Sequence, residues 1–132
     1  YVSLPLAPKP LVVAVTQDAE TARFLREKVI DRGYGLLLTE SGREALEVCR
    51  NKPPAVLVLD RRIQGSDVRE IILQLREDAK TKRLPVIVLG LQTLERNEVD
   101  IYRHFGIFYS TLPWREKELS RSLAMAVLGK LR

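Results

Sequence analysis

Five short apolar runs alternate along the chain with segments of helical periodicity. They cover residues 11–15, 34–39, 55–59, 85–89 and 107–109. The first, third and fourth runs are almost entirely apolar, which is typical of strands that are covered on both faces of a parallel sheet. Strands that alternate with helices through short connections form right-handed crossovers. The sequence therefore predicts an α/β fold, a doubly wound sheet of five parallel strands with helices on both faces.

The helical segments between these runs have recognisable ends. Residues 18–32 stop at Gly33, a residue suited to the left-handed end of a helix. Residues 41–51 open with a predicted capping box, in which Ser41 and Glu44 satisfy each other's backbone donors, and they stop before Pro53.

Two further segments have amphipathic spacing, and a third is less regular. Residues 66–78 and the C-terminal segment carry apolar side chains at helical intervals. These side chains are Val68, Ile71, Ile72 and Leu75, and then Leu119, Leu123, Ala126 and Val127. Charged residues interrupt the apolar pattern of residues 93–105, so we expect a helix there that is more exposed or more mobile.

The size of the chain limits what it can contain. Its 132 residues, 45% of them hydrophobic, fit one domain with one core. We expect a proline-containing linker over residues 1–10 and the domain over residues 11–132. Cys49, the single cysteine, is predicted to be a core residue. The chain has no apolar stretch long enough for a bilayer and no secretory signal pattern, so we expect a cytoplasmic domain without membrane contact.

The formal net charge of +5 raises the question of nucleic-acid binding. The cations are not clustered, because acidic residues lie between them in separate predicted helices. Examples are Arg23, Arg26, Arg50, Arg69, Arg76 and Arg103. We therefore expect solvated helix faces and no nucleic-acid partner.

Asp60 ends the third apolar run, in the stretch VLVLDRRIQG. In α/β sheets the carboxyl ends of the strands border the crevice where such folds place their chemistry. Asp60 is therefore a candidate functional residue, although a single carboxylate can also cap the next turn or face water.

The residues around Asp60 resemble a known family, the receiver domains of bacterial two-component response regulators. The stretch LVLDRRIQGSD is similar to the family's third strand and phosphoacceptor aspartate, and RLPVIVLG is similar to its fourth strand. Placing Pro113 of FYSTLPW on the proline that usually follows the family's lysine extends the resemblance through the fifth strand. It implies a flavodoxin-like fold and a role in phosphorelay signal transduction.

The same resemblance implies that the acceptor site is degenerate. A family receiver takes a phosphoryl group from a histidine kinase with the help of Mg²⁺, which an acidic pair after the first strand holds. It also uses a Ser or Thr after the fourth strand and a lysine after the fifth. This chain has Thr16 and Gln17, Gly90, and Leu112 at those positions. Since Mg²⁺ prefers anionic oxygen ligands, we expect weak or absent Mg²⁺ binding, no metal site and no other cofactor.

Four nearby residues could modify this site. A guanidinium of Arg61 or Arg62 could occupy the vacated metal volume and pair with Asp60, which would make a locked, metal-free pocket. The alternative is two solvent-facing arginines. Asp18 could cap the first helix or assist a metal. Tyr109 matches the family's switch aromatic, or it is an ordinary packed strand residue.

The preferred function is a signalling receiver domain with a degenerate acceptor site, not itself an enzyme, that acts mainly through protein contacts. The alternative is an active aspartyl phosphoacceptor at Asp60. YVSLPLAP resembles the end of a histidine-kinase ATP-binding domain, which suggests a hybrid kinase as the parent protein. We expect partners among kinase domains in cis or other signalling proteins. A homodimer through the fourth helix, fifth strand and fifth helix is possible by the resemblance, with Trp114 as an interface candidate.

Overall fold

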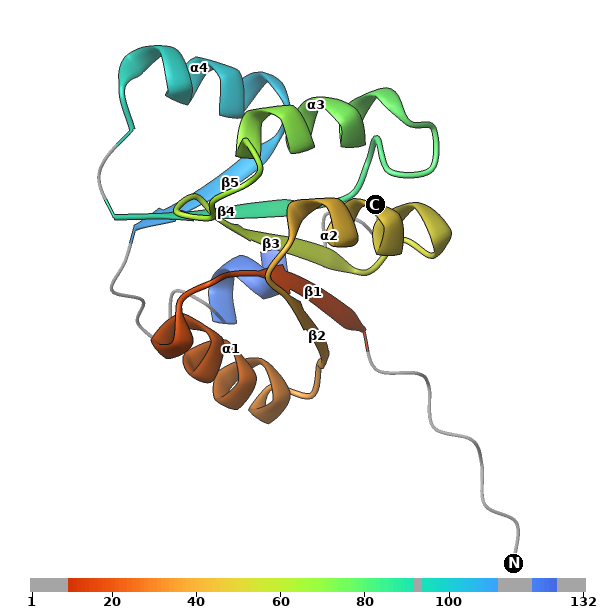
Figure 1. The fold of residues 1–132 in the computed structure, drawn as a ribbon, viewed down its shortest axis with the longest axis vertical. Coiled ribbons are helices and arrows are strands. Elements are labelled where there is room, and N and C mark those ends of the chain that lie inside the picture. The colour runs from red at the N-terminus through yellow and green to blue at the C-terminus, as the bar shows by residue number, and fades with distance from the viewer. Residues whose placement is uncertain (1–9, 92–93, 112–119, 126–132) are drawn as a thin grey trace, which may run out of the picture.

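A computed structural model describes residues 10–91, 94–111 and 120–125. Strands and helices alternate in it as predicted, and residues 120–125 are also helical (Figure 1). The elements are β1 (Leu11–Val15), α1 (Ala19–Asp31), β2 (Gly35–Thr39), α2 (Gly42–Asn51), β3 (Val56–Asp60), α3 (Val68–Glu77), β4 (Val86–Gly90), α4 (Arg96–His104) and β5 (Ile107–Thr111).

The strands form one parallel sheet in the order β2-β1-β3-β4-β5, which confirms the predicted doubly wound fold. Figure 1 shows α2, α3 and α4 on one face of the sheet and α1 with residues 120–125 on the other. Two apolar clusters correspond to these faces: one joins the sheet to α2, α3 and α4, and the other joins it to α1 and Leu123.

The central strands β3 and β4 are buried along their whole length, whereas the edge strands β2 and β5 are partly exposed. Both central strands run one residue beyond the predicted apolar runs, because the ladder continues through the pairs Asp60–Leu89 and Gly90–Thr111. Apolar patterning could not predict these last residues, since a carboxylate and a glycine end the runs. The extension places Asp60 and Gly90 within the rigid sheet.

Side chains cap the first three helices. Asp18 is the N-cap of α1, and Asp67 is the N-cap of α3. Ser41 caps α2 by accepting from Glu44 N, but the predicted reciprocal bond is wrong. The Ser41 N–H donates to Thr39 Oγ1 at 3.2 Å, and the Thr39 hydroxyl donates to the Glu44 carboxylate at 2.7 Å. Thr39, at the end of β2, is therefore inserted between the two members of the expected capping box.

Helix α4 is the most exposed of the named helices, as its interrupted pattern predicts. Within it only Tyr102 is buried, and its N-cap, Glu95, makes no side-chain capping bond. Tyr102 packs in the same cluster as the sheet, with Ile101 and Phe105 partly buried beside it. The apolar pattern alone did not single out Tyr102, because a tyrosine suits both surface and core.

Several other predictions are resolved in part. Cys49 is fully buried, and burial raises the pKa of its thiol to about 11, which confirms a core residue.

Some residues named above lie outside the described part of the chain: those of the linker over 1–9, Leu112, Pro113, Trp114, Leu119, Ala126 and Val127. None of the helices in the described ranges has the length and apolar character of a membrane span.

The Arg76 side chain of α3 donates hydrogen bonds to the end of α4 and to the loop before β4, at the end of the sheet away from Asp60. Its Nε donates to Phe105 O at 2.9 Å, and Nη1 donates to Leu84 O at 2.7 Å and Thr81 O at 3.3 Å. The guanidinium thus satisfies carbonyls before β4 and at the end of α4 that have little access to water.

Replacing Arg76 by methionine should lower the free energy of unfolding by about 3 kcal/mol, because carbonyls that lose their donors stay partly buried. Urea unfolding measures this loss. The matched control is Arg43→Met on the exposed face of α2, expected to change stability by less than about 0.5 kcal/mol. Equal losses in the two variants would contradict the role given to Arg76.

Candidate functional site

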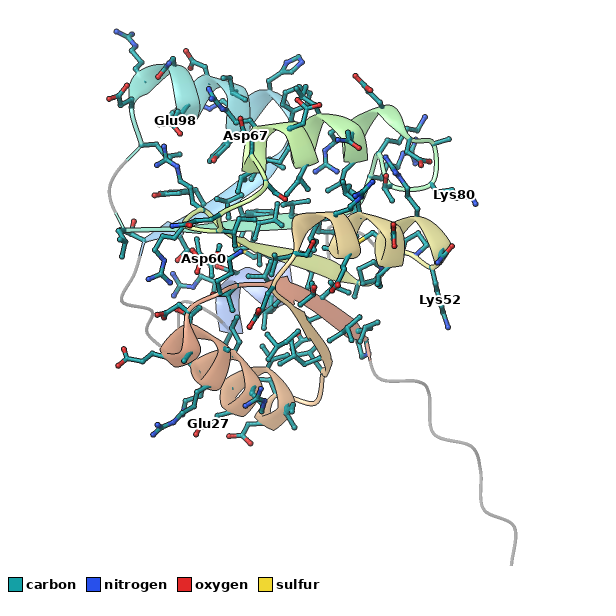
Figure 2. The ribbon with its side chains drawn as sticks, in the orientation of Figure 1. Glu27, Lys52, Asp60, Asp67, Lys80 and Glu98 are labelled. Atoms are coloured by element: carbon teal, nitrogen blue, oxygen red, sulfur yellow. The ribbon has the colours of Figure 1, made fainter. Side chains whose placement is uncertain are left out.

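The candidate site lies at the carboxyl ends of β1 and β3, where Asp60 closes the third strand (Figure 2). Asp60 is 1% exposed, so its carboxylate is almost completely removed from solvent. Thr16, the residue after β1, is also buried and faces it. The parallel pairing of β1 with β3 brings these residues together, although they lie 44 positions apart in the chain.

Both oxygens of Asp60 accept two hydrogen bonds each. Oδ1 accepts from the Arg62 backbone N–H and from Arg62 Nε, both at 2.9 Å. Oδ2 accepts from Arg62 Nη2 at 2.8 Å and from the Thr16 hydroxyl at 2.7 Å. A carboxylate offers about four lone-pair positions, so these donors use its accepting capacity.

These contacts decide the charge state of Asp60. Burial acts to raise the pKa of the carboxyl, but the hydrogen bonds from Arg62 and Thr16, together with the Arg62 charge, outweigh it. The pKa of Asp60 is therefore below its ordinary value of 3.8. Asp60 is an anion at neutral pH, neutralised by an arginine that follows it two residues later.

Arg62 is itself held in place by helix α1. Its Nη2 donates to the Thr21 hydroxyl at 2.8 Å and lies 3.6 Å from Asp18 Oδ2. The Thr21 hydroxyl in turn donates to Asp18 Oδ2 at 2.7 Å. Hydrogen bonds to Asp60 raise the pKa of the Arg62 guanidinium, and its side chain is 32% exposed. Arg62 is thus fixed by both the strand-end carboxylate and the first turn of α1.

Arg61 does not pair with Asp60, and the idea that its guanidinium occupies the pocket is wrong. Its backbone N–H donates to Leu89 O at 2.8 Å, and its guanidinium forms an ion pair with Glu98 of α4. Arg61 and Arg62 lie in the turn that follows β3, and their side chains leave it in different directions, Arg61 toward Glu98 of α4 and Arg62 toward Asp60 and Thr21. The alternative in which both arginines face solvent is also wrong, because Arg62 reaches Asp60.

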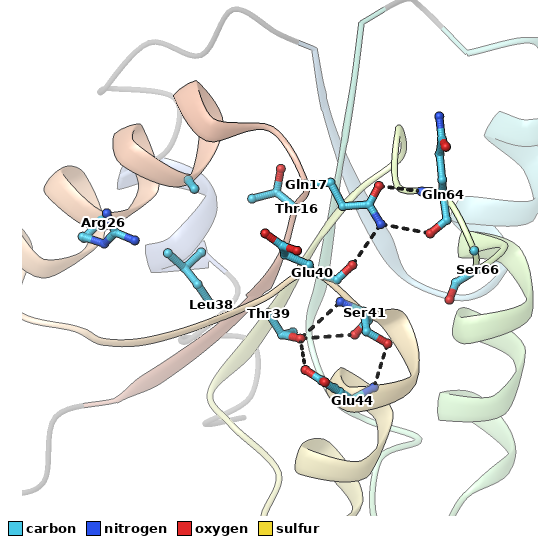
Figure 3. Close-up of a pocket in the computed structure, with 12 residues that line it drawn as sticks. Thr16, Gln17, Arg26, Leu38, Thr39, Glu40, Ser41, Glu44, Gln64 and Ser66 are labelled. Carbon is cyan, nitrogen blue, oxygen red and sulfur yellow. Dashed lines mark hydrogen bonds between the residues drawn. The ribbon is translucent and has the colours of Figure 1, made fainter.

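Asp18 and Gln17, beside Thr16, are engaged away from the Asp60 carboxylate. Asp18 Oδ2 accepts from Thr21 N at 2.9 Å, which confirms its capping role. Figure 3 shows the Gln17 amide between two loops: Nε2 donates to Glu40 O at 3.0 Å and Gln64 O at 2.9 Å, and Oε1 accepts from Gln64 N at 3.0 Å. Gln17 therefore joins the loops that follow β1, β2 and β3.

A polar cavity of about 620 Å³ lies beside the Gln17 amide. It is bordered by residues of the same loops and of α1 and α2, among them Thr16, Arg26, Glu40, Glu44 and Ser66 (Figure 3). Asp60 is absent from its lining, because Thr16 and Arg62 cover the carboxylate.

Residues at the Asp60 carboxylate do not suit Mg²⁺. Within the described ranges, no group of three or more His, Cys, Asp or Glu side chains could hold a metal ion. A hard divalent cation requires several oxygen ligands, usually including carboxylates, and Asp60 is already surrounded by donors. An added cation at its oxygens would also lie beside the Arg62 guanidinium, and like charges repel by about 4 kcal/mol at 4 Å and an effective dielectric of 20.

Gly90 and Tyr109 lie next to each other on β4 and β5. The Tyr109 side chain occupies the space where a larger residue at position 90 would place its Cβ, and Tyr109 also contacts the ring of Tyr102. The predicted pairing of Arg62 with Asp60 is confirmed. The bonds of the Gln17 amide and the contact of Tyr109 with Gly90 were not predicted.

Two residues of the site were missed altogether. Thr21 has the weak signal of lying three residues after a helix-capping aspartate. Glu98 has no local signal, because its partner Arg61 lies 37 positions away.

Comparisons with known proteins bear on this arrangement. No protein-family model matches the chain. Protein PilH of Pseudomonas aeruginosa is 24% identical over 118 residues, covering 89% of this chain and 98% of PilH. The solved chemotaxis protein CheY4 of Vibrio cholerae superposes with a TM-score of 0.80 at 19% identity, covering 89% of this chain and 98% of CheY4. The chain has the fold of a response-regulator receiver domain.

A third similar structure contains a metal ion. It is the receiver domain of a sensor histidine kinase from Pseudomonas aeruginosa, solved with a magnesium ion coordinated in the active site cleft. It superposes on this chain with a TM-score of 0.80 at 18% identity, covering 90% of this chain and 98% of that one. The common fold is therefore compatible with a metal site, and the side chains in the cleft decide whether one forms.

Replacing Arg62 by methionine should raise the pKa of Asp60, because burial then acts against fewer compensating hydrogen bonds. In the wild type the lowered pKa contributes stability above pH 3.8, and this contribution is lost as the pH falls through the folded-state pKa. The difference in unfolding free energy between wild type and variant should therefore grow as the pH rises through the acidic range.

Urea unfolding at several pH values measures this difference. The control is Arg23→Met, which removes an exposed ion pair with Glu27 and should give a small difference that varies little with pH. A difference for Arg62→Met that is equally independent of pH would show that Arg62 does not control the Asp60 carboxyl.

Proposed function

We propose that this chain is a receiver domain with a degenerate acceptor site, in which Arg62 takes the place of a metal ion. The observation that carries the proposal is the two-pronged pairing of Arg62 with the buried Asp60 carboxylate. The domain would act through contacts with kinase domains in cis or with another signalling protein, and it would not serve as an efficient phosphate acceptor.

The chemistry of phosphoryl transfer supports this proposal. An attacking carboxylate oxygen needs a free lone pair, and the transferred group needs cations around its equatorial oxygens. Each Asp60 oxygen already accepts two hydrogen bonds, and Arg62 is directed at the carboxylate itself. For Asp60 to react, the two charge-assisted hydrogen bonds from the Arg62 guanidinium to its carboxylate would have to break. The hydrogen bond from Arg62 to Thr21 opposes this movement of the guanidinium.

The parent protein and the contact surface are part of the same proposal. We place the domain in the cytoplasm, after a linker over residues 1–10, within a hybrid sensor histidine kinase. The receiver of a sensor histidine kinase among its structural neighbours supports that setting. The proposed interface is the face of α4 and β5 with the following helix, in a homodimer or with a partner. Trp114, its predicted anchor, lies outside the described residues.

Incubation with acetyl phosphate and Mg²⁺ tests the proposal directly. Intact-mass spectrometry should show little or no added phosphate on the wild type, because the Asp60 oxygens are occupied and the site lacks ligands for the metal. An Asp60→Asn variant gives the background from labelling elsewhere. Stable phosphate at Asp60 in the wild type would refute the degenerate site and establish the alternative, an active phosphoacceptor.

A designed metal site provides a second test. The double variant Thr16→Asp/Arg62→Met should gain Mg²⁺ binding, because it places two carboxylates at the strand ends and removes the competing cation. Mg²⁺ should raise its melting temperature and leave that of the wild type unchanged.

The matched control is Thr16→Asn/Arg62→Met, which has nearly the same shape without the second charge. Saturable stabilisation of the wild type by Mg²⁺, with the same midpoint as the designed variant, would contradict the proposal.

A further inference from the structure

The contact between Gly90 and Tyr109 has a steric cause. A Cβ added to Gly90 would lie 2.7 Å from Tyr109 Cζ and 3.0 Å from Cε1, and it would overlap the Tyr109 hydroxyl. Real Cβ atoms essentially never approach other atoms so closely. Gly90 has no positive φ angle, so its backbone conformation is open to any residue. A larger residue at position 90 would therefore require the Tyr109 side chain to move, because that side chain fills the position of a Cβ on β4.

The Tyr109 side chain is held from two other directions. The Tyr102 ring on α4 lies with its centroid 6.0 Å from that of Tyr109. The guanidinium of Arg61 hydrogen-bonds to Tyr109 and forms the ion pair with Glu98 of α4. Figure 2 shows Glu98 on α4 at the same end of the sheet as Asp60. Since the Arg61 backbone is bonded to Leu89 of β4, the network joins β4, β5 and α4.

The position of Tyr109 affects the surface between α4 and β5. A groove of about 480 Å³ lies there, and Tyr109 forms part of its wall. The other lining residues are Leu94, Val99, Tyr102, Arg103, Ile107 and Thr111. A tyrosine ring displaced from Gly90 would have to move within or across this groove, which would change the shape of the face.

We propose that Gly90 keeps Tyr109 seated against β4, and that this pair, with Arg61 and Glu98, holds the α4–β5 face in a single arrangement that does not depend on Asp60. The inference rests on the proposed function for its signalling role, since that function assigns contacts to this face. The neighbouring arginines serve separate networks, with Arg62 on Asp60 and Arg61 on Tyr109 and Glu98. In this proposal, packing sets the shape of the α4–β5 face, and a change at Asp60 does not alter it.

The variant Gly90→Ala tests whether Gly90 keeps Tyr109 against β4. In the wild type, proton NMR should show nuclear Overhauser contacts from the Tyr109 ring to Gly90 and to the Tyr102 ring. In Gly90→Ala these contacts should be lost, and chemical shifts should change along α4 and β5. The control is Gly35→Ala, also in a strand, where a Cβ would meet Leu11 Cδ1 at 3.5 Å and Pro10 O at 3.9 Å, both ordinary van der Waals contacts. That variant should keep every Tyr109 contact.

A double variant covers the case in which Gly90→Ala does not fold. Gly90→Ala/Tyr109→Leu removes the hydroxyl and the ring atoms that overlap the new Cβ, so it should fold. Rescue of this kind supports the steric pairing. A folded Gly90→Ala that retains the Tyr109 contacts overturns the proposal. If Gly90→Ala does not fold, a double variant that also fails to fold overturns it.

Asp60→Asn tests whether the α4–β5 face is independent of Asp60. It should leave the Tyr109 contacts and the α4 shifts as in the wild type, and their displacement would overturn this part of the proposal. The result is distinct from the acetyl phosphate experiment. Phosphate on Asp60 with unchanged Tyr109 contacts would refute the proposed function but not the contact between Gly90 and Tyr109. Unlabelled Asp60 with displaced Tyr109 contacts would support the proposed function and refute the further inference.

Discussion

A carboxylate buried at the end of a central strand needs a compensating partner, and the pairing of Asp60 with Arg62 provides it. An isolated buried anion is strongly unfavourable, so Asp60 would otherwise be protonated or would require a bound cation. Arg62 supplies the positive charge from within the chain, and Thr16 completes the set of donors. The first turn of α1 then depends on the same pair, because Thr21 and Asp18 hold the outer side of the guanidinium.

The same interaction explains how the end of the sheet is organised. Asp60 is neutralised by Arg62, and the nearby Gln17 amide joins the loops after β1, β2 and β3. Arg61, directed to the opposite side of the strand end, connects β3 to α4 through Glu98. In the function that we propose, these hydrogen bonds between protein groups take the place of a metal and a phosphoryl group, and the domain acts through protein contacts.

The sequence predicted the larger elements well, because their signals are local. The apolar runs located the strands to within a residue or two, and Asp18 marked the start of α1. Other features were not predicted because they depend on contacts outside the local segment. Ser41 caps α2 as predicted, but the reciprocal bond from Glu44 is wrong because Thr39, outside the predicted helix, bonds to both groups. Tyr102 was missed because its burial depends on the packing of α4 against β5.

The sequence by itself determined the α/β alternation, the position of Asp60 at a strand end, and the residue types around it that are unfavourable for Mg²⁺. These properties follow from hydrophobic periodicity and from the charges of individual side chains. Only the tertiary structure decided which arginine reaches Asp60, what Gln17 binds, and that Tyr109 fills the space above Gly90. The reason is geometric: the direction of each side chain and the register of strands distant in sequence fix these contacts, and no local pattern encodes them.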